Sequence, residues 1–256
     1  MTRPAECSRR DFLVFGSVGT ILAPVAHLFP WWKPKEVALA DSQFEIQRAK
    51  HPKRQYIHIH GDETTARDVL TKHLETHPGT AFLTDSKTRE IPIDDGKVDP
   101  NRVFSRNGAA VNLKRNNPNW SGRQMQDALD LLEEQREHFL DAVMPRDGEL
   151  LVALHNNSSS YSVDSEVAIS DMRSLKQPDN PHAFFLCTDP GDYQILSTSP
   201  YNVVLQQHVR AVDDGSLSRR AAARLARYVN LEVAMGDAPR QQEMLNWLEE
   251  HLPYRA

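Results

Sequence analysis

Two histidines and a glutamate in this sequence have the types and the spacing of ligands for one metal ion. His60 ends an alternating segment, residues 56–60, and a glycine then permits a turn before Glu63, which opens the next predicted helix. The turn brings an imidazole and a carboxylate toward one point. His155 ends the apolar segment 151–155 and could supply a third ligand from another strand. Zinc accepts both ligand types, and a catalytic zinc has three protein ligands and an open position for water. The pattern therefore predicts a site for one Zn²⁺ ion.

Each of these signals is weak when it is taken singly. A His-x-x-Glu spacing occurs by chance in many chains, and a lone histidine at the end of a strand is more often structural than a ligand. His58 lies two residues before His60 and points to the same face of the strand, so we expect it to pack or to support a ligand. The alternative to a metal centre is a structural domain in which His60 and His155 lie far apart.

Strands that alternate with helices must position these residues. Apolar and turn patterns predict strands over residues 56–60, 80–84, 150–155, 183–188, 202–206 and 229–235. They predict helices over residues 64–77, 121–144, 219–228 and 239–251, with Ser121 and Ser216 as N-caps. Residues 86–119 are polar and irregular, and we expect a loop that is functional or disordered. The alternation predicts an α/β fold with a mixed, largely parallel sheet flanked by helices.

Three short motifs follow one another along the chain. The first is His60-Gly61-Asp62-Glu63, with His155 after a later strand. The second is Asp99-Pro100-Asn101-Arg102-Val103-Phe104, and the third is Glu232 on a late strand. Together they resemble the motifs of the zinc carboxypeptidase superfamily, in particular its succinylglutamate desuccinylase/aspartoacylase branch. The resemblance spans residues 56–235, which is most of the expected domain.

The resemblance implies a single carboxypeptidase-like domain with one zinc ion held by His60, Glu63 and His155. It implies that Asn101 and Arg102 bind a carboxylate of the substrate. In the family a glutamate at the position of Glu232 is catalytic, and an arginine polarises the scissile carbonyl. Three residues are candidates for that arginine, namely Arg89, Arg106 and Arg115.

The residue types at two of these positions suit the implied roles. Arg102 offers a planar fork that can hold a carboxylate by two charge-assisted hydrogen bonds. A polar turn after Pro100 is the simpler alternative for this segment. Glu232 lies on an otherwise apolar strand, where a carboxylate is costly unless it has a partner or a task. As a general base it would take a proton from water and pass it to the leaving nitrogen. A solvated glutamate at the edge of a sheet is the alternative there.

The charge balance excludes one class of function. The formal net charge is -5, which argues against general affinity for nucleic acid, because such affinity needs a basic face. The helix predicted over residues 219–228 is basic. We expect its arginines to form a solvated face, with a groove for an anionic substrate as the alternative; they are Arg219, Arg220, Arg224 and Arg227.

The N-terminal segment has the pattern of a targeting signal. Residues 8–13 read Ser-Arg-Arg-Asp-Phe-Leu, and an uncharged run covers residues 12–32. This resembles a twin-arginine export signal, which implies the twin-arginine translocase as a partner during export and a periplasmic or extracellular domain. The small residues around Leu39 predict cleavage after Ala40, which divides the chain into a signal, residues 1–40, and a hydrolase domain, residues 41–256. An uncleaved signal that anchors the domain to the membrane is the alternative, because the run is long enough to span a bilayer.

The sequence as a whole predicts a zinc-dependent hydrolase that cleaves an amide or peptide bond next to a free carboxylate. The expected substrate is a small peptide, an N-acyl amino acid or a cell-wall peptide. The alternative is an exported metal-binding or ligand-binding protein of the same fold without catalysis.

Overall fold

The computed structural model describes residues 35–50, 52, 54–146, 148–158, 160–208 and 213–254. The twin-arginine pattern and the apolar run after it lie outside these residues. Among the residues that are described, no helix is long and apolar enough to cross a membrane. The chain from Pro34 to Ala256 forms one compact unit.

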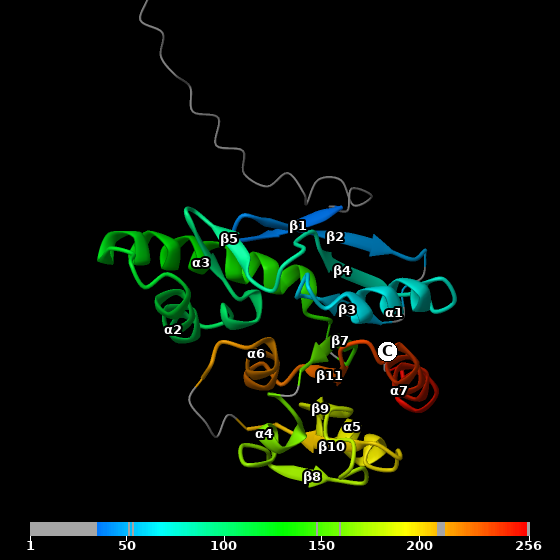
Figure 1. The fold of residues 1–256 in the computed structure, drawn as a ribbon. Coiled ribbons are helices and arrows are strands. Elements are labelled where there is room, and N and C mark those ends of the chain that lie inside the picture. Colours follow the sequence, from blue (N-terminus) through cyan, green and yellow to red (C-terminus); the bar gives the residue numbers. More distant parts are fainter. Residues whose placement is uncertain are drawn as a thin grey trace, which may run out of the picture. The chain divides into compact units, whose positions relative to one another are not determined.

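A nine-stranded sheet runs through the described part of this unit, in the order β1-β2-β4-β3-β7-β11-β9-β10-β8 (Figure 1). The four strands β4, β3, β7 and β11 are mutually parallel, and antiparallel pairs lie on both sides of them. The sheet consists of β1 (Glu36–Leu39), β2 (Ser42–Arg48), β3 (Gln55–His58), β4 (Thr80–Thr84), β7 (Leu150–Asn157), β8 (Met172–Ser174), β9 (Phe184–Cys187), β10 (Asn202–Leu205) and β11 (Arg227–Ala234). The predicted α/β fold with a mixed, largely parallel sheet is confirmed.

Helices cover both faces of this sheet. Helices α2 (Arg106–Asn116), α3 (Gly122–Val143) and α6 (Leu217–Ala223) pack on one face, which we call the α3 face. Helices α1 (Thr64–Leu74), α5 (Pro190–Leu196) and α7 (Ala238–His251) pack on the other, the α1 face. Strand β7 is buried along its whole length because it lies between the two layers. This explains the continuous apolar sequence of its first five residues, Leu150–Leu154.

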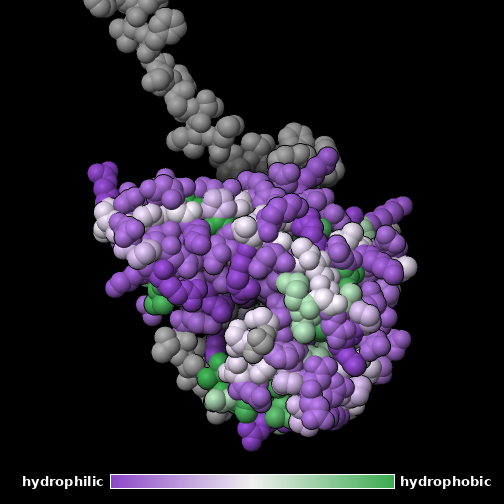
Figure 2. All heavy atoms as spheres, in the orientation of Figure 1, coloured by the Kyte–Doolittle hydropathy of each residue, from purple (hydrophilic) through white to green (hydrophobic). Residues whose placement is uncertain are grey.

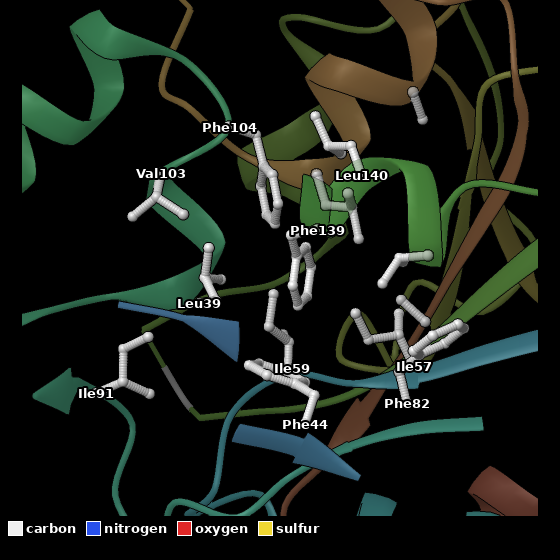
Figure 3. Packing of buried hydrophobic residues seen from close by; sticks show 14 of the residues in the cluster. Leu39, Phe44, Ile57, Ile59, Phe82, Ile91, Val103, Phe104, Phe139 and Leu140 are labelled. Carbon is white, nitrogen blue, oxygen red and sulfur yellow. The ribbon is translucent and has the colours of Figure 1, made fainter. Parts of the chain in front are cut away.

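Phe139 of α3 connects the core to the segment that carries the predicted carboxylate-binding motif (Figure 3). Its ring lies 4.9 Å from the ring of Phe44 on β2 and 5.9 Å from the ring of Phe104. Phe104 is fully buried and follows the short 3₁₀ helix η2 (Pro100–Arg102). The aromatic contacts therefore fix the position of η2 above the sheet.

The prediction of a loop over residues 86–119 was wrong. This region forms the hairpin of β5 (Ile91–Ile93) and β6 (Gly96–Val98), then η2 and α2. The Ser105 side chain caps α2 by accepting a hydrogen bond from the Gly108 N–H. Helix α2 buries only Ala109 and Leu113 among its larger apolar positions, so its sequence carries little helical periodicity.

The predicted helix over residues 219–228 is also placed differently. Helix α6 ends at Ala223, and Leu225 then has a φ of 55°, which no α-helix allows. Arg227 and Tyr228 already belong to β11. The remaining predicted helices are present with shifted ends, and α3 begins with the predicted Ser121 cap.

Strand β1 bears on where an export signal can be cut. The division of the chain at residue 40 stays a prediction, but the sheet begins before that residue. Residues 36–39 pair with β2, and Ala40 lies in the turn between the two strands. Val37 is 4% exposed and Leu39 is 0% exposed. Cleavage after Ala40 would therefore remove a strand that packs into the core.

A protein that begins at residue 41 is expected to be less stable than one that begins at residue 34. Burial of an aliphatic side chain contributes roughly 1.5–3 kcal/mol, so loss of Val37 and Leu39 together should cost about 3–6 kcal/mol. Urea unfolding of both proteins, followed by circular dichroism, measures the difference. Equal midpoints would show that β1 does not contribute to stability.

Candidate metal centre

The three predicted metal ligands lie together in the structure. One donor atom from each of His60, Glu63 and His155 can be chosen so that all lie within 4.8 Å of one another, and all three residues are buried. His60 and Glu63 follow β3, and His155 lies on the neighbouring parallel strand β7. Carboxyl ends of parallel strands meet at one edge of a sheet, which explains the convergence. The alternative in which the two histidines lie far apart was wrong.

Both imidazoles present Nδ1 to the Glu63 carboxylate. His60 Nδ1 lies 2.8 Å from Glu63 Oε1, and His155 Nδ1 lies 3.0 Å from Glu63 Oε2. The other nitrogen of His60, Nε2, lies 2.9 Å from Oδ1 of Asp99. A carboxylate on the far nitrogen fixes the ring and its tautomer, as is usual for a metal-binding histidine. Two imidazoles and a carboxylate fit a catalytic zinc, and these residues would hold it.

The charges at this centre favour a cation. Burial opposes a charged imidazole, but Glu63 and Asp99 raise the pKa of His60 to about 9. Burial likewise disfavours the Glu63 carboxylate, yet His155 and His60 hold its pKa well below the usual range. The carboxylates Glu63 and Asp99 therefore stabilise positive charge in this buried place, which the His60 ring and the Arg89 guanidinium supply and a metal ion could share.

His58 contacts the backbone of Glu63 and so supports the position of this residue. Its Nε2 lies 3.0 Å from the backbone oxygen of Glu63. Burial lowers the pKa of His58 to about 4, so the ring is neutral at physiological pH and donates one hydrogen bond to that oxygen. The expected supporting role fits this contact.

Glu232 lies beside the candidate metal ligands. In the parallel pairing of β7 and β11 it stands directly opposite His155, and it is 5% exposed. Burial raises the pKa of its carboxyl group, and the charge on Glu63 adds to this, while His155 opposes it. Asn230 and Asn157 each donate a hydrogen bond to the carboxylate at 3.1 Å. The alternative of a solvated glutamate at the sheet edge was wrong.

Arg102, at the end of η2, lines the same cavity as Glu232. Its Nη1 donates to the Asn101 backbone oxygen at 2.7 Å and lies 3.9 Å from Asp214 Oδ2, and the side chain is 32% exposed. Asn101 lines the cavity as well, but its Oδ1 accepts a hydrogen bond from the Leu217 N–H at 2.8 Å. Asn101 thus also fixes the start of α6.

One of the three candidate arginines reaches the centre. Arg89 places Nη1 3.1 Å from Glu63 Oε1 and Nε 3.6 Å from Asp99 Oδ2. Arg106 instead pairs with Asp130 and Glu133 on α3. Arg89 lines the cavity beside the metal ligands, whereas Arg106 and Arg115 do not. The geometry therefore favours Arg89 over the other two.

A cavity of about 630 Å³ opens over these residues. Its wall includes the metal ligands, Glu232, Arg89 and Arg102, together with Arg219 of α6. Its volume suits a small organic ligand. Figure 2 shows a mostly hydrophilic face of the molecule, on which hydrophobic residues form only small scattered groups.

The sequence prediction for the arginines of residues 219–227 was partly wrong. Arg219 is only 5% exposed and lines the cavity, and its buried Nη1 has no hydrogen-bond partner in the part of the chain that the structure describes. Arg227 is buried in a bidentate ion pair with Asp192. Arg220 and Arg224 do reach the surface, where both pair with Glu137. The spacing of these four arginines in the sequence suggested one helical face, but only Arg219 and Arg220 lie on α6, whereas Arg224 follows its end and Arg227 begins β11.

Known proteins give little further information on this chain. A scan against protein-family models found no match, and a search of the curated proteins found none either. Among the solved structures, one described as "a putative metallopeptidase from Shewanella amazonensis" is similar to this chain at 12% identity, with 86% of each chain covered and a TM-score of 0.40. A similarity with so low a TM-score does not support an inference about function. The proposed function is therefore based on the residues of this chain.

Proposed function

We propose that this protein is a zinc-dependent hydrolase that cleaves an amide or peptide bond next to a free carboxylate. The observation that carries the proposal is the buried group of His60, Glu63 and His155 with Glu232 directly opposite His155. The candidate metal-binding group and the Glu232 carboxylate, which forms no ion pair with another described residue, line one cavity. This combination is the one that metal-assisted hydrolysis needs.

Each residue has a role that its position supports. When bound, zinc supplies a Lewis acid and lowers the pKa of its bound water toward about 7. Glu232 would take a proton from the attacking water as the water oxygen bonds to the carbonyl carbon, and it would deliver that proton to the leaving nitrogen as the C–N bond breaks. Among the described arginines and lysines, Arg89 is the one that pairs with a candidate metal ligand, at 3.1 Å from Glu63, and it would stabilise the charge that develops on the carbonyl oxygen.

The cavity wall supports an anionic substrate. Arg102 and Arg219 both line the cavity; Arg102 has one ion pair, at 3.9 Å from Asp214, and Nη1 of Arg219 has no hydrogen-bond partner among the described residues. Arg102 and the Asn101 segment bind the carboxylate next to the scissile bond. Small peptides, N-acyl amino acids and cell-wall peptides all offer this combination of groups.

The decisive experiment measures metal content and bond cleavage with the same preparation. The purified protein is expected to hold one equivalent of zinc and to release free amine from members of a panel of dipeptides and N-acetyl amino acids. Each substrate is paired with its carboxamide, which lacks the negative charge. A protein without zinc would contradict the proposal, and so would equal cleavage of acids and carboxamides.

Arg219→Gln is expected to raise KM for the anionic substrates about tenfold, because a hydrogen bond to a charged group contributes roughly 1.5–3 kcal/mol. Steady-state kinetics on the best acid of the panel measures this change. Arg220→Gln is the matched control, since Arg220 is the next residue of α6 and pairs with Glu137 outside the cavity. Equal KM values for both variants would show that Arg219 does not contribute to substrate binding.

A second candidate function is binding without catalysis. Arg89 favours it, because its contacts with Glu63 and Asp99 leave it engaged with the carboxylates around the metal site. This alternative predicts zinc binding and ligand binding but no release of amine from any member of the panel.

Export completes the proposal. The protein would be carried by the twin-arginine translocase and would act in the periplasm or outside the cell, with the signal either cleaved or retained as an anchor. Substitution of Arg9 and Arg10 by lysine is expected to keep the protein in the cytoplasmic fraction. Unchanged distribution would contradict the export route.

A further inference from the structure

Two asparagines hold the carboxylate of Glu232, one on each oxygen. Asn230 Nδ2 donates to Oε1 and Asn157 Nδ2 donates to Oε2, both at 3.1 Å. All three side chains are more than 90% buried. Asn157 Nδ2 also donates to the backbone oxygen of His182 at 2.9 Å, which ties it to the segment before β9.

The sheet places both asparagines on the cavity side. Alternate residues of a strand share a face, so Asn230 lies on the same face of β11 as Glu232, and Asn157 on the same face of β7 as His155. Because β7 and β11 are paired in register, Asn230 stands beside Ala153, which has a small side chain. The two amides therefore approach the carboxylate from neighbouring strands.

The orientation of the two amides is unfavourable for the fold alone. With both Nδ2 groups turned to Glu232, the buried Oδ1 atoms of Asn157 and Asn230 have no hydrogen-bond partner among the described residues. Buried polar atoms are seldom left without partners, because each such atom costs free energy. An apolar strand without this carboxylate would avoid the cost. The arrangement is therefore explained by the need to hold Glu232.

We propose that Asn157 and Asn230 are positioning residues for Glu232. By donating one hydrogen bond to each oxygen, they hold the carboxylate beside His155, at the place from which it accepts a proton from water. This inference rests on the proposed function for the role of Glu232, although the contacts do not depend on it.

The test uses the full-length, zinc-loaded protein with Asn230→Ala, Asn157→Ala and the near-isosteric Asn230→Asp, which removes the donor while keeping the shape. Each Ala variant is expected to lower kcat roughly ten- to hundredfold, since a misplacement of about 1 Å can cost a hundredfold. KM and zinc content should change less than about twofold. Asn230→Asp should lower kcat at least as much as Asn230→Ala, because it brings a second carboxylate to Glu232.

A double-mutant cycle separates positioning from general loss of structure. In a Glu232→Gln background, Asn230→Ala should change kcat less than about twofold, because the group that it positions has been replaced. The control is Asn202→Ala, which removes a buried asparagine of β10 that binds backbone groups outside the cavity wall. This variant should lower the unfolding temperature without lowering kcat. An equal loss of kcat from Asn230→Ala in both backgrounds would overturn the proposal.

Crystal structures of the zinc-loaded variants decide the proposal without any substrate. The Glu232 carboxylate is expected to leave its wild-type position in Asn230→Ala and Asn157→Ala, and an unmoved carboxylate in both would overturn the inference. If the wild-type protein cleaves nothing in the panel, the proposed function fails, and these structures alone decide whether the asparagines position Glu232.

Discussion

His155→Ala is expected to abolish stoichiometric zinc binding by the purified protein. The substitution removes one of three protein ligands and leaves the Glu63 carboxylate without one of the two imidazoles that contact it. We expect zinc affinity to fall at least a hundredfold, which competition with a chromogenic chelator measures. Asp99→Asn should have a smaller effect, about ten- to hundredfold, because Asp99 acts through the far nitrogen of His60.

His251→Ala provides the matched control for this experiment. His251 is an exposed histidine at the end of α7 and is no part of the candidate metal group. The control should bind zinc as the wild type does. If His155→Ala also retained one tightly bound zinc, the assignment of the metal centre would be wrong.

Glu232→Gln is expected to lower kcat by roughly a hundred- to ten-thousandfold, which is the usual contribution of a general base. Zinc content should stay at the wild-type value, because Glu232 is not in the metal-binding group. Single-turnover and steady-state rates on the best substrate of the panel measure the loss.

The control for this second substitution is Glu243→Gln, which changes an exposed glutamate of α7 that pairs with Arg240. Its rate should match that of the wild type. Full activity of Glu232→Gln on every cleaved substrate would refute the proposed mechanism, since Glu232 is the residue of β11 that pairs with His155.

Local patterns were sufficient to predict the elements that carry the metal ligands. Strand β7 is apolar from Leu150 to Leu154 and polar from His155 to Asn157, so the sequence shows where the apolar part of the strand ends. Helix α3 has a clear apolar face and the capping box of Ser121 and Gln124. The convergence of His60 and His155 follows from the parallel pairing of β3 and β7, which the alternation of strands and helices suggests.

Residues whose roles depend on contacts between distant segments could not be predicted in this way. Asp99 reaches His60 over 39 positions of sequence, and Arg219 resembles its exposed neighbours until the packing of α6 is known. Strand β1 is only four residues long, and its small residues resemble a cleavage site as much as a strand. The carboxylate of Glu232 and the amides of Asn157 and Asn230 likewise meet only when β7 and β11 pair.

The path of the chain through the sheet has a consequence for where a ligand can bind. From β3 the chain passes through α1, on one face, to β4, and it returns through α3, on the opposite face, to β7 on the other side of β3. The segments that leave β3 and β7 at their carboxyl ends also turn to opposite faces, because β3 leads to α1 and β7 leads to α4 (Val163–Val167), whose Val163 packs on the α3 face. A crevice at the carboxyl ends of these strands is the expected result of such a topological switch point. His60 and His155 lie at this crevice. The hollow thus originates in the backbone topology, and the side chains that line it determine only which ligand it accepts.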